Sequence, residues 1–261
     1  MNRFGLAKGQ VVYVFASLVI GCQELTPEAR QMLTEGVNSY EKAEYNSATT
    51  KLSQFIDKNK EAPEVAEAHY IRGLCQLKLS HRSEARRDFE VALQRASRKD
   101  LIARAQACLA VMAYDDGNWA TAANYYGEAL PWIEDIHDYD DHLLRHGISL
   151  QRLGQWEPSR QVFARILHKY PNGAAAKSAK TLMGWNRPYF TVQCHALSKP
   201  DAAANEVARL RKLGLDASQQ METRQGQALY LVQVGQYKTY DEALQALERI
   251  KRHVPGARVV P

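Results

Sequence analysis

The chain has 261 residues, of which 45% are hydrophobic, and its formal net charge is +5. That length is enough for one or two hydrophobic cores, because domains usually contain about 100–200 residues. The positive charge is mild and is not gathered into a long basic run, so composition gives no argument for nucleic-acid binding.

The first residues have the layout of a signal peptide. Arg3 and Lys8 precede an uncharged apolar run, Val11 to Gly21. A helix of that length extends only about 16 Å, roughly half the hydrocarbon thickness of a bilayer, so the run is too short for a comfortable membrane span. We therefore expect residues 1–21 to be removed.

The residues Val19-Ile20-Gly21-Cys22 resemble the lipobox of bacterial lipoproteins. The resemblance implies that the Cys22 thiol takes a diacylglycerol and that Cys22 becomes the acylated first residue, followed by a linker over 22–28. Two or three acyl chains anchor a protein stably. Gln23 in place of Asp implies, in a Gram-negative cell, an outer-membrane lipoprotein facing the periplasm. An ordinary signal peptide with an incidental cysteine is the alternative.

The other cysteines, Cys75, Cys108 and Cys194, form no CxxC pair and no disulfide framework. We expect small buried hydrophobic residues at these positions. A disulfide between Cys75 and Cys108 is the alternative.

A period of 37 residues extends through residues 29–171. It relates five columns of residues: Gly36, Gly73, Ala110 and Gly147; Tyr45, Arg82, Trp119 and Trp156; Ala48, Ala85, Ala122 and Ser159; Leu52, Phe89, Tyr126 and Phe163; and Phe55, Ala92, Ala129 and Ile166. Each unit reads as two amphipathic helices joined by a short polar turn, at 43–44, 80–81, 117–118 and 154–155. Small residues in the first helix let the second approach closely.

This pattern resembles the tetratricopeptide repeat (TPR), most clearly in AYDDGNWATAANYYGEALP and LQRLGQWEPSRQVFARILHKYP. Arg82 departs from the aromatic column. The resemblance implies an all-α solenoid over residues 29–185, made of four units and a capping helix after Pro171, with a groove for a protein or peptide. A purely structural spacer is the alternative. We place the domain boundary at Asn186-Arg187-Pro188, which breaks the helical pattern.

From Tyr189 the periodicity changes to that of strands. Strands are predicted at 189–196, near 217–224, at 229–234 and at 258–260, with helices at 201–213 and 240–253. The order is β-α-β-β-α-β, a small α+β domain over 187–261. In YLVQVGQYKTYDEA, Gly235 turns the chain after a strand, Tyr237 covers the sheet end and Thr239 begins the next helix.

VQVGQY-KTYDEALQALERI and FTVQCHALSKPDAAANEVARLRKLGL resemble the SPOR (sporulation-related) domain. The resemblance implies binding to peptidoglycan, with preference for denuded glycan strands, from which the stem peptides have been removed. Successive side chains of a strand point to opposite faces of the sheet. The residues expected to face the helices are Phe190, Val192, Cys194, Tyr230, Val232 and Val234. The open face is then predicted to carry Tyr189, Thr191, Gln193, His195, Leu229, Leu231 and Gln233.

By this resemblance, Gln193 is the leading candidate for a glycan contact. Arg224 would be a second contact if side chains of the strand near 217–224 alternate between the two faces in the same way. His195 stands where the family commonly has glycine, and Leu229 replaces a typically aromatic residue; either change would weaken or retune binding. A SPOR-like fold used only for protein contacts is the alternative. The strand order also describes an RNA-recognition module, but glutamines and leucines occupy the stacking positions that such a module fills with aromatic residues.

The run His137 to His146 contains three histidines and three aspartates. The aspartates suit a helix start, so we predict no metal site there. No catalytic signature is present, and we predict no enzyme and no cofactor. The expected function is that of a cell-envelope lipoprotein in cell division or wall remodelling that binds peptidoglycan and a protein. A TPR assembly or chaperone-like factor for outer-membrane proteins is the alternative.

Overall fold

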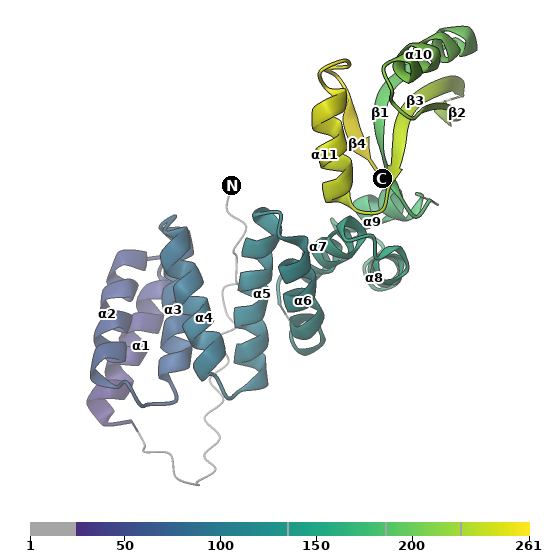
Figure 1. Cartoon of the computed structure of the whole chain (residues 1–261). Coiled ribbons are helices and arrows are strands. Elements are labelled where there is room, and N and C mark those ends of the chain that lie inside the picture. The colour runs from purple at the N-terminus through teal and green to yellow at the C-terminus, as the bar shows by residue number, and fades with distance from the viewer. Residues whose placement is uncertain (1–24, 135, 186, 225) are drawn as a thin grey trace. The chain divides into compact units, whose positions relative to one another are not determined.

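The structure, a computed structural model, describes residues 25–261 except 135, 186 and 225. The predicted signal peptide and Cys22 lie outside these residues. The chain divides into two compact units, residues 1–145 and 146–261. Figure 1 gives the order of the elements.

Antiparallel helices build the first unit, and each of the first six packs against the next in the chain (Figure 1). These helices are α1 (Pro27–Glu41), α2 (Tyr45–Lys58), α3 (Val65–Lys78), α4 (Arg82–Arg95), α5 (Lys99–Asp115) and α6 (Trp119–Ala129). A short 3-10 helix (Leu130–Trp132) follows, and α7 (Tyr139–Arg152) crosses into the second unit. The predicted pairs of helices are confirmed.

Small residues bring the two helices of a repeat together. A Cβ atom added to Gly36 would lie 2.7 Å from the Leu52 side chain, and one added to Gly73 would lie 2.8 Å from Phe89. Gly147 faces Phe163 in the same way. The column of small residues therefore packs against the column of large ones one helix later.

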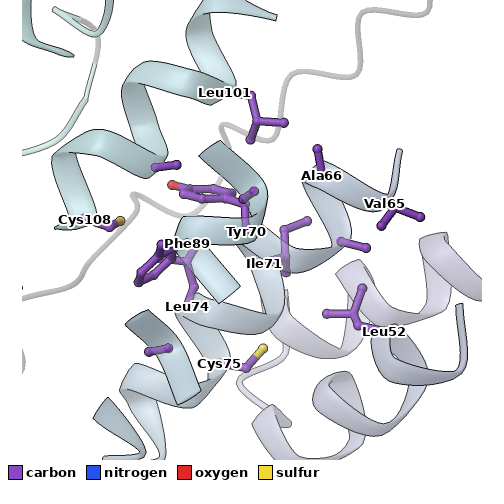
Figure 2. Packing of buried hydrophobic residues seen from close by; sticks show 14 of the residues in the cluster. Leu52, Val65, Ala66, Tyr70, Ile71, Leu74, Cys75, Phe89, Leu101 and Cys108 are labelled. Carbon is purple, nitrogen blue, oxygen red and sulfur yellow. The ribbon is translucent and has the colours of Figure 1, made fainter. Parts of the chain in front are cut away.

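Figure 2 shows the core of the first unit, with Tyr70 and Phe89 side by side. Their ring centroids are 6.0 Å apart. Cys75 and Cys108 are buried free thiols, and Cys194 in the second unit is another. Burial raises the pKa of Cys75 and of Cys108 to about 12. These thiols behave as the small hydrophobic residues that were expected.

The four turns between paired helices share one backbone conformation. Ala43, Ser80, Gly117 and Gly154 have φ values of 61°, 66°, 73° and 74°. After each of the four, the next N–H donates to a carbonyl five residues back: Glu44 to Ser39, His81 to Gln76, Asn118 to Ala113 and Gln155 to Leu150. This bond is the long one of a Schellman motif, which satisfies carbonyls at the helix end. The turns therefore recur at the same spacing of 37 residues as the helices, and they share a conformation that is visible only in the structure.

The second unit continues with α8 (Trp156–Lys169) and α9 (Ala176–Met183) and ends in an α+β domain. The elements of that domain are β1 (Phe190–Leu197), α10 (Pro200–Lys212), β2 (Ala217–Arg224), β3 (Gln227–Tyr237), α11 (Tyr240–Ile250) and β4 (Arg258–Val260). The antiparallel sheet has the order β2-β3-β1-β4. The predicted β-α-β-β-α-β fold is confirmed.

Helices α10 and α11 cover one face of this sheet (Figure 1). Val192, Val232 and Val234 pack there against Val207 and Leu247. Cys194 and Tyr230 belong to the same cluster, so the predicted inward positions on β1 and β3 are confirmed. The other helices that the structure describes belong to the repeats, so the opposite face is without a helix from residues 187–224 and 226–261.

An aromatic cluster ties α8 to the sheet. Trp156 of α8 and Phe190 of β1 have ring centroids 4.9 Å apart, and Ala243 of α11 completes the buried cluster. The guanidinium of Arg152 lies 3.2 Å from the ring centroid of Tyr240. The compact unit therefore begins well before the predicted boundary at 186–188.

Candidate functional site

The sheet register identifies the residues of the open face. Directly paired residues of an antiparallel sheet point to the same side. Gln193 pairs with Gln233, which pairs in turn with Ser218, and Leu231 pairs with Gln220. These residues alternate with the valines that face the helices, so Gln193, Leu231 and Gln233 lie on the open face as predicted.

This face is hollowed by a pocket of about 360 Å³. A volume of that size is within the range of small-molecule sites. The side chains around it are mostly polar and contain no carboxylate; they include Arg187, Tyr189, Thr191, Gln220, Gln233 and Gln236. A ligand there would meet amides, a phenol ring and a cation.

Gln233 has the least satisfied side chain of the pocket. The residue is only 4% exposed, and its amide nitrogen has no hydrogen-bond partner among the residues that the structure describes. A buried donor without a partner costs free energy of about 1–3 kcal/mol. Such a group is typical of a site that is completed by a ligand.

Thr191 serves the fold at the rim of the pocket. Its hydroxyl donates to the carbonyl oxygens of Val234 and Gly235 at 3.2 Å and 2.8 Å. Gly235 has a φ of 71°, and a Cβ atom there would meet the ring of Tyr237. Thr239 then caps α11 in a capping box with Glu242. The predicted turn at Gly235 is wrong, because β3 continues through it to Tyr237. Gly235 lies instead where the register between β1 and β3 shifts, and it lines the pocket. The predicted helix start at Thr239 is confirmed.

The predicted position of His195 on the open face is wrong. The register shifts between Gln193 and His195, so that His195 pairs with Val232 on the helix side. Its Nε2 lies 3.1 Å from a carboxylate oxygen of Glu206 on α10. A β-bulge inserts one extra residue and reverses the alternation beyond it.

The other predicted site residues are spread along the sheet. Gln193 is 7% exposed and does not line the pocket, whereas Tyr189 and Thr191 do. Leu231 is buried, and Leu229 is half-buried opposite Glu222. The backbone of Arg224 pairs with Gln227, and its side chain lies outside the described residues.

Arg187 is a pocket residue that the sequence analysis missed, because it was assigned to the domain boundary. Trp185, Arg187 and Tyr189 occur at a spacing of two ahead of the first strand. Residues 187–189 form a bend ahead of β1, so strand alternation does not place the Arg187 side chain. The arginine between two aromatic residues in the sequence is the signal that would have identified it.

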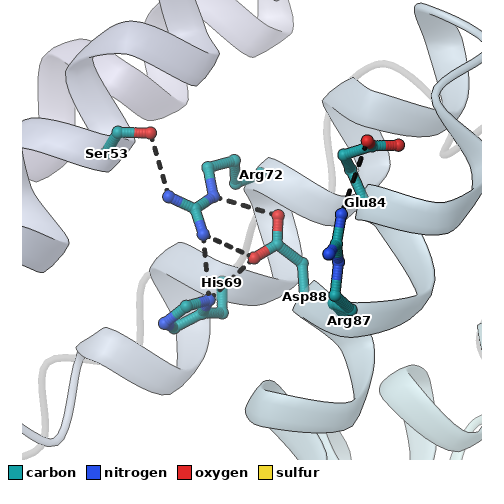
Figure 3. Close-up of polar contacts among 6 residues, drawn as sticks. All are labelled: Ser53, His69, Arg72, Glu84, Arg87 and Asp88. Atoms are coloured by element: carbon teal, nitrogen blue, oxygen red, sulfur yellow. Dashed lines mark hydrogen bonds and ion pairs between the residues drawn. The ribbon is translucent and has the colours of Figure 1, made fainter.

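The repeats hold a buried polar cluster of a different kind (Figure 3). Arg72 donates to both carboxylate oxygens of Asp88, at 2.9 Å and 2.6 Å, and to the Ser53 hydroxyl at 2.9 Å. The Nδ1 atom of His69 lies 2.8 Å from Asp88. Burial acts to raise the pKa of Asp88, but the hydrogen bonds from His69 and Arg72 hold it below its usual range. The cluster joins α2 to α3 and α4, and we assign it to the fold.

The histidine and aspartate run does not form a ligand set. Among the described residues, no group of three or more His, Cys, Asp or Glu side chains is placed to hold a metal ion. Burial lowers the pKa of both His142 and His146 to about 4. The ring of His142 lies edge-on to Tyr126, with centroids 5.8 Å apart. These two histidines are packing residues of α7.

Nowhere between Leu25 and Pro261 does the structure describe a helix with the length and hydropathy of a membrane span.

Comparison with protein families gives two matches. Residues 186–261 match the SPOR domain, and residues 143–173 match the tetratricopeptide repeat. No curated protein matches this sequence.

One solved structure supports the repeat fold, and a second is reported beside it. A tetratricopeptide repeat protein from Parabacteroides merdae is similar, with a TM-score of 0.51 and 16% sequence identity. The match covers 60% of this chain and 59% of that protein. The PilF structure from Pseudomonas aeruginosa matches with a TM-score of 0.49 and 17% identity, over 59% of this chain and 66% of that one. The chain thus spans less than two thirds of either protein.

SPOR domains bind peptidoglycan and tetratricopeptide repeats bind proteins, so both matched regions are of a binding kind. The chain therefore carries tetratricopeptide repeats followed by a C-terminal SPOR domain.

Proposed function

We propose that this protein binds denuded glycan strands of peptidoglycan on the open face of its SPOR sheet and holds a protein partner through its repeats. It acts without catalysis, in cell division or wall remodelling. Acyl chains on Cys22 keep it on the outer membrane, facing the periplasm. The protein then links a membrane, a partner and the wall.

The pocket beside Gln233 is the observation that carries the glycan assignment. A sugar chain presents hydroxyls, N-acetyl groups and apolar ring faces. The pocket offers the matching groups, namely amide side chains, the ring of Tyr189 and the unpaired nitrogen of Gln233. Exposed amides and aromatic rings are suited to such a ligand, because the amides satisfy hydroxyls and the rings cover apolar faces.

Sedimentation with purified cell walls tests this assignment. Residues 25–261 are mixed with untreated walls and with walls stripped by an amidase, and the pelleted fraction is measured. We expect more protein on stripped walls and a loss of this gain in Gln233→Met. Gln245→Met makes the same change at an exposed position of α11 and is the matched control. Equal pelleting on both walls, or none on either, contradicts the proposal.

Cys22 is tested separately, because the anchor and the wall site are independent. In cells, Cys22→Ser is expected to leave the protein in the soluble periplasmic fraction, since two or more acyl chains account for stable anchoring. Membrane association that survives Cys22→Ser would contradict lipidation at this residue.

A further inference from the structure

Arg187 is positioned by aromatic rings at the entrance of the open-face pocket. Its guanidinium carbon lies 5.7 Å from the ring centroid of Trp185 and 5.9 Å from that of Tyr189. Both distances are within the range of a cation-π contact. The two rings restrict the guanidinium without neutralising its charge.

The segment that carries these rings is itself held in place. The indole N–H of Trp185 donates to the Tyr189 carbonyl at 3.3 Å, and Arg160 of α8 donates to the Trp185 carbonyl at 3.4 Å. Trp185 also packs against the cluster around Trp156 and Phe190. The pocket entrance is therefore pre-organised by contacts with both α8 and β1, which lowers the entropy lost on binding.

No acidic group balances Arg187. Within residues 25–261, apart from the three positions the structure leaves undescribed, no carboxylate forms an ion pair with it, and none lines the pocket. Gln233 lines the same pocket, and its amide nitrogen is buried without a hydrogen-bond partner among the described residues. A cation and an unused donor on one pocket fit a ligand group that is anionic and accepts hydrogen bonds, which is the chemistry of a carboxylate.

A denuded glycan strand carries such a group on every second sugar. In intact peptidoglycan the lactyl carboxyl of the muramyl residue is joined to the stem peptide by an amide, which is neutral. Hydrolysis of that amide consumes one water, releases the peptide amine and leaves the lactyl carboxylate. Stripped and intact strands therefore differ in charge as well as in bulk at the same position.

We propose that Arg187, held between Trp185 and Tyr189, binds the lactyl carboxylate of stripped strands, with Gln233 as a second donor. This inference rests on the proposed glycan binding and names the group that is recognised. A guanidinium can engage a carboxylate through two parallel hydrogen bonds, which a lysine cannot reproduce. Arg187 is then a specificity determinant, distinct from the amides that contact the rest of the sugar.

A pair of defined ligands separates charge from bulk. Stripped glycan strands are compared with the same strands after each lactyl carboxylate has been converted to a methyl amide, and affinity for residues 25–261 is measured by calorimetry. We expect about tenfold tighter binding of the carboxylate form, which is the usual strength of one charge-assisted hydrogen bond. Arg187→Gln is expected to bind both ligands with the affinity that the wild type has for the amide form.

Arg258→Gln is the matched control, because Arg258 is exposed opposite Gln193 on the same face but does not line the pocket. It should retain the tenfold preference. Equal binding of the two ligands by the wild type, or a preference that persists in Arg187→Gln, overturns the role of Arg187 and leaves glycan binding intact. Failure of the wild type to bind either ligand overturns the proposed function itself.

Discussion

At the scale of single residues, the side-chain amide of Gln233 lowers the stability of the fold and, in the proposed function, contributes to glycan binding. An amide donor that is buried without a partner destabilises the folded state, whereas an apolar side chain of similar length at the same position does not. A buried polar group without a partner is a feature that needs an explanation, and binding of a ligand is one that this pocket offers. The proposed glycan contact would offset the cost of the buried amide.

Gln233→Met is accordingly expected to raise the free energy of unfolding by about 1 kcal/mol while binding is lost. Chemical denaturation of both proteins, followed by tryptophan fluorescence, measures the difference. The exposed control Gln245→Met should change stability by less than about 0.5 kcal/mol in either direction. A destabilised Gln233→Met protein would mean that the amide has a structural partner in solution.

The two histidines of α7 make stability depend on pH. Burial lowers the pKa of His142 and of His146 from 6.5 to about 4. At His142, the positive charge of Arg145 lowers the pKa further, whereas Asp141 and Asp138 raise it. At His146, Arg165 lowers the pKa further. Between these values the unfolded chain binds protons that the folded chain does not, so stability rises with pH across the window from about 4 to 6.5 and is fully present above it.

We expect each histidine to remove about 1–2 kcal/mol of stability between pH 7 and pH 4, which is less than the full shift implies because both side chains keep some contact with water. His142→Phe should flatten the profile of melting temperature against pH in that window. A profile that is unchanged by both His142→Phe and His146→Phe would show that other groups titrate there.

The open face shows which parts of a site period-two alternation can predict. Gln193, Leu231 and Gln233 were placed correctly, because each alternates with valines that face the helices, and Gln193 pairs directly with Gln233 between two register shifts. His195 was misplaced because a bulge depends on the geometry of the paired strand, which no single-strand pattern contains. Arg187 was missed because it belongs to no strand, so the alternation of strand residues did not apply to it, and the aromatic residues on either side of it were not used as a signal.

At the scale of elements, the period of 37 residues determined almost all of the repeat architecture. The small residues, the large residues that face them and the turns recur at one spacing, so the helix pairs could be predicted from sequence. What the period did not reveal is the conformation of the turns. Ala43 and Ser80 adopt the left-handed backbone that glycine adopts at 117 and 154.

This difference predicts where substitution by glycine stabilises the protein and where it destabilises it. A left-handed conformation costs a residue with a side chain about 1–2 kcal/mol, and glycine avoids that cost. Ala43→Gly and Ser80→Gly are therefore each expected to stabilise the protein by about 1 kcal/mol, after allowance for the entropy of glycine in the unfolded chain. Ala208→Gly, at an exposed position in the interior of α10 (Pro200–Lys212), should instead destabilise it by about 1 kcal/mol. Thermal denaturation of the three variants tests this difference in sign. The prediction is wrong if the melting temperatures of all three variants shift in the same direction.

The cluster of Trp156, Phe190 and Ala243 makes α8 part of the folding unit that contains the SPOR sheet. Family matches place residue 156 in the repeat and residue 190 in the SPOR domain, so neither sequence pattern alone contains this contact. A fragment of residues 187–261 lacks Trp156 and exposes the ring of Phe190, whereas a fragment of residues 146–261 retains both.

Trp156→Ala in residues 146–261 is expected to cost about 3–5 kcal/mol, the usual range for a buried aromatic residue. The fragment of residues 187–261 should then melt well below the fragment of residues 146–261. Trp132→Ala in residues 25–261 is the control, because Trp132 is 54% exposed. Equal melting temperatures for the two fragments would mean that the cluster adds nothing to the stability of the sheet.

At the scale of the whole molecule, we assign partner binding, wall binding and membrane anchoring to different parts of the chain. The repeats of residues 25–145 contain no part of the pocket, and the pocket residues all lie after residue 186. A membrane anchor and a wall site on one chain raise the effective concentration of each for its target, even when each binds weakly alone. The function of such a protein depends on the covalent connection between the anchor and the wall site as well as on the affinity of each.

This division predicts which half pellets with cell walls. Residues 146–261 should sediment with stripped walls as residues 25–261 do, because they contain the sheet, the segment of Arg187 and the α8 contacts that hold it. Residues 25–145 should remain in the supernatant, and Gln233→Met should release residues 146–261 as well. Sedimentation of residues 25–145 would assign wall binding to the repeats, and the open face of the sheet would then be free to serve the protein partner.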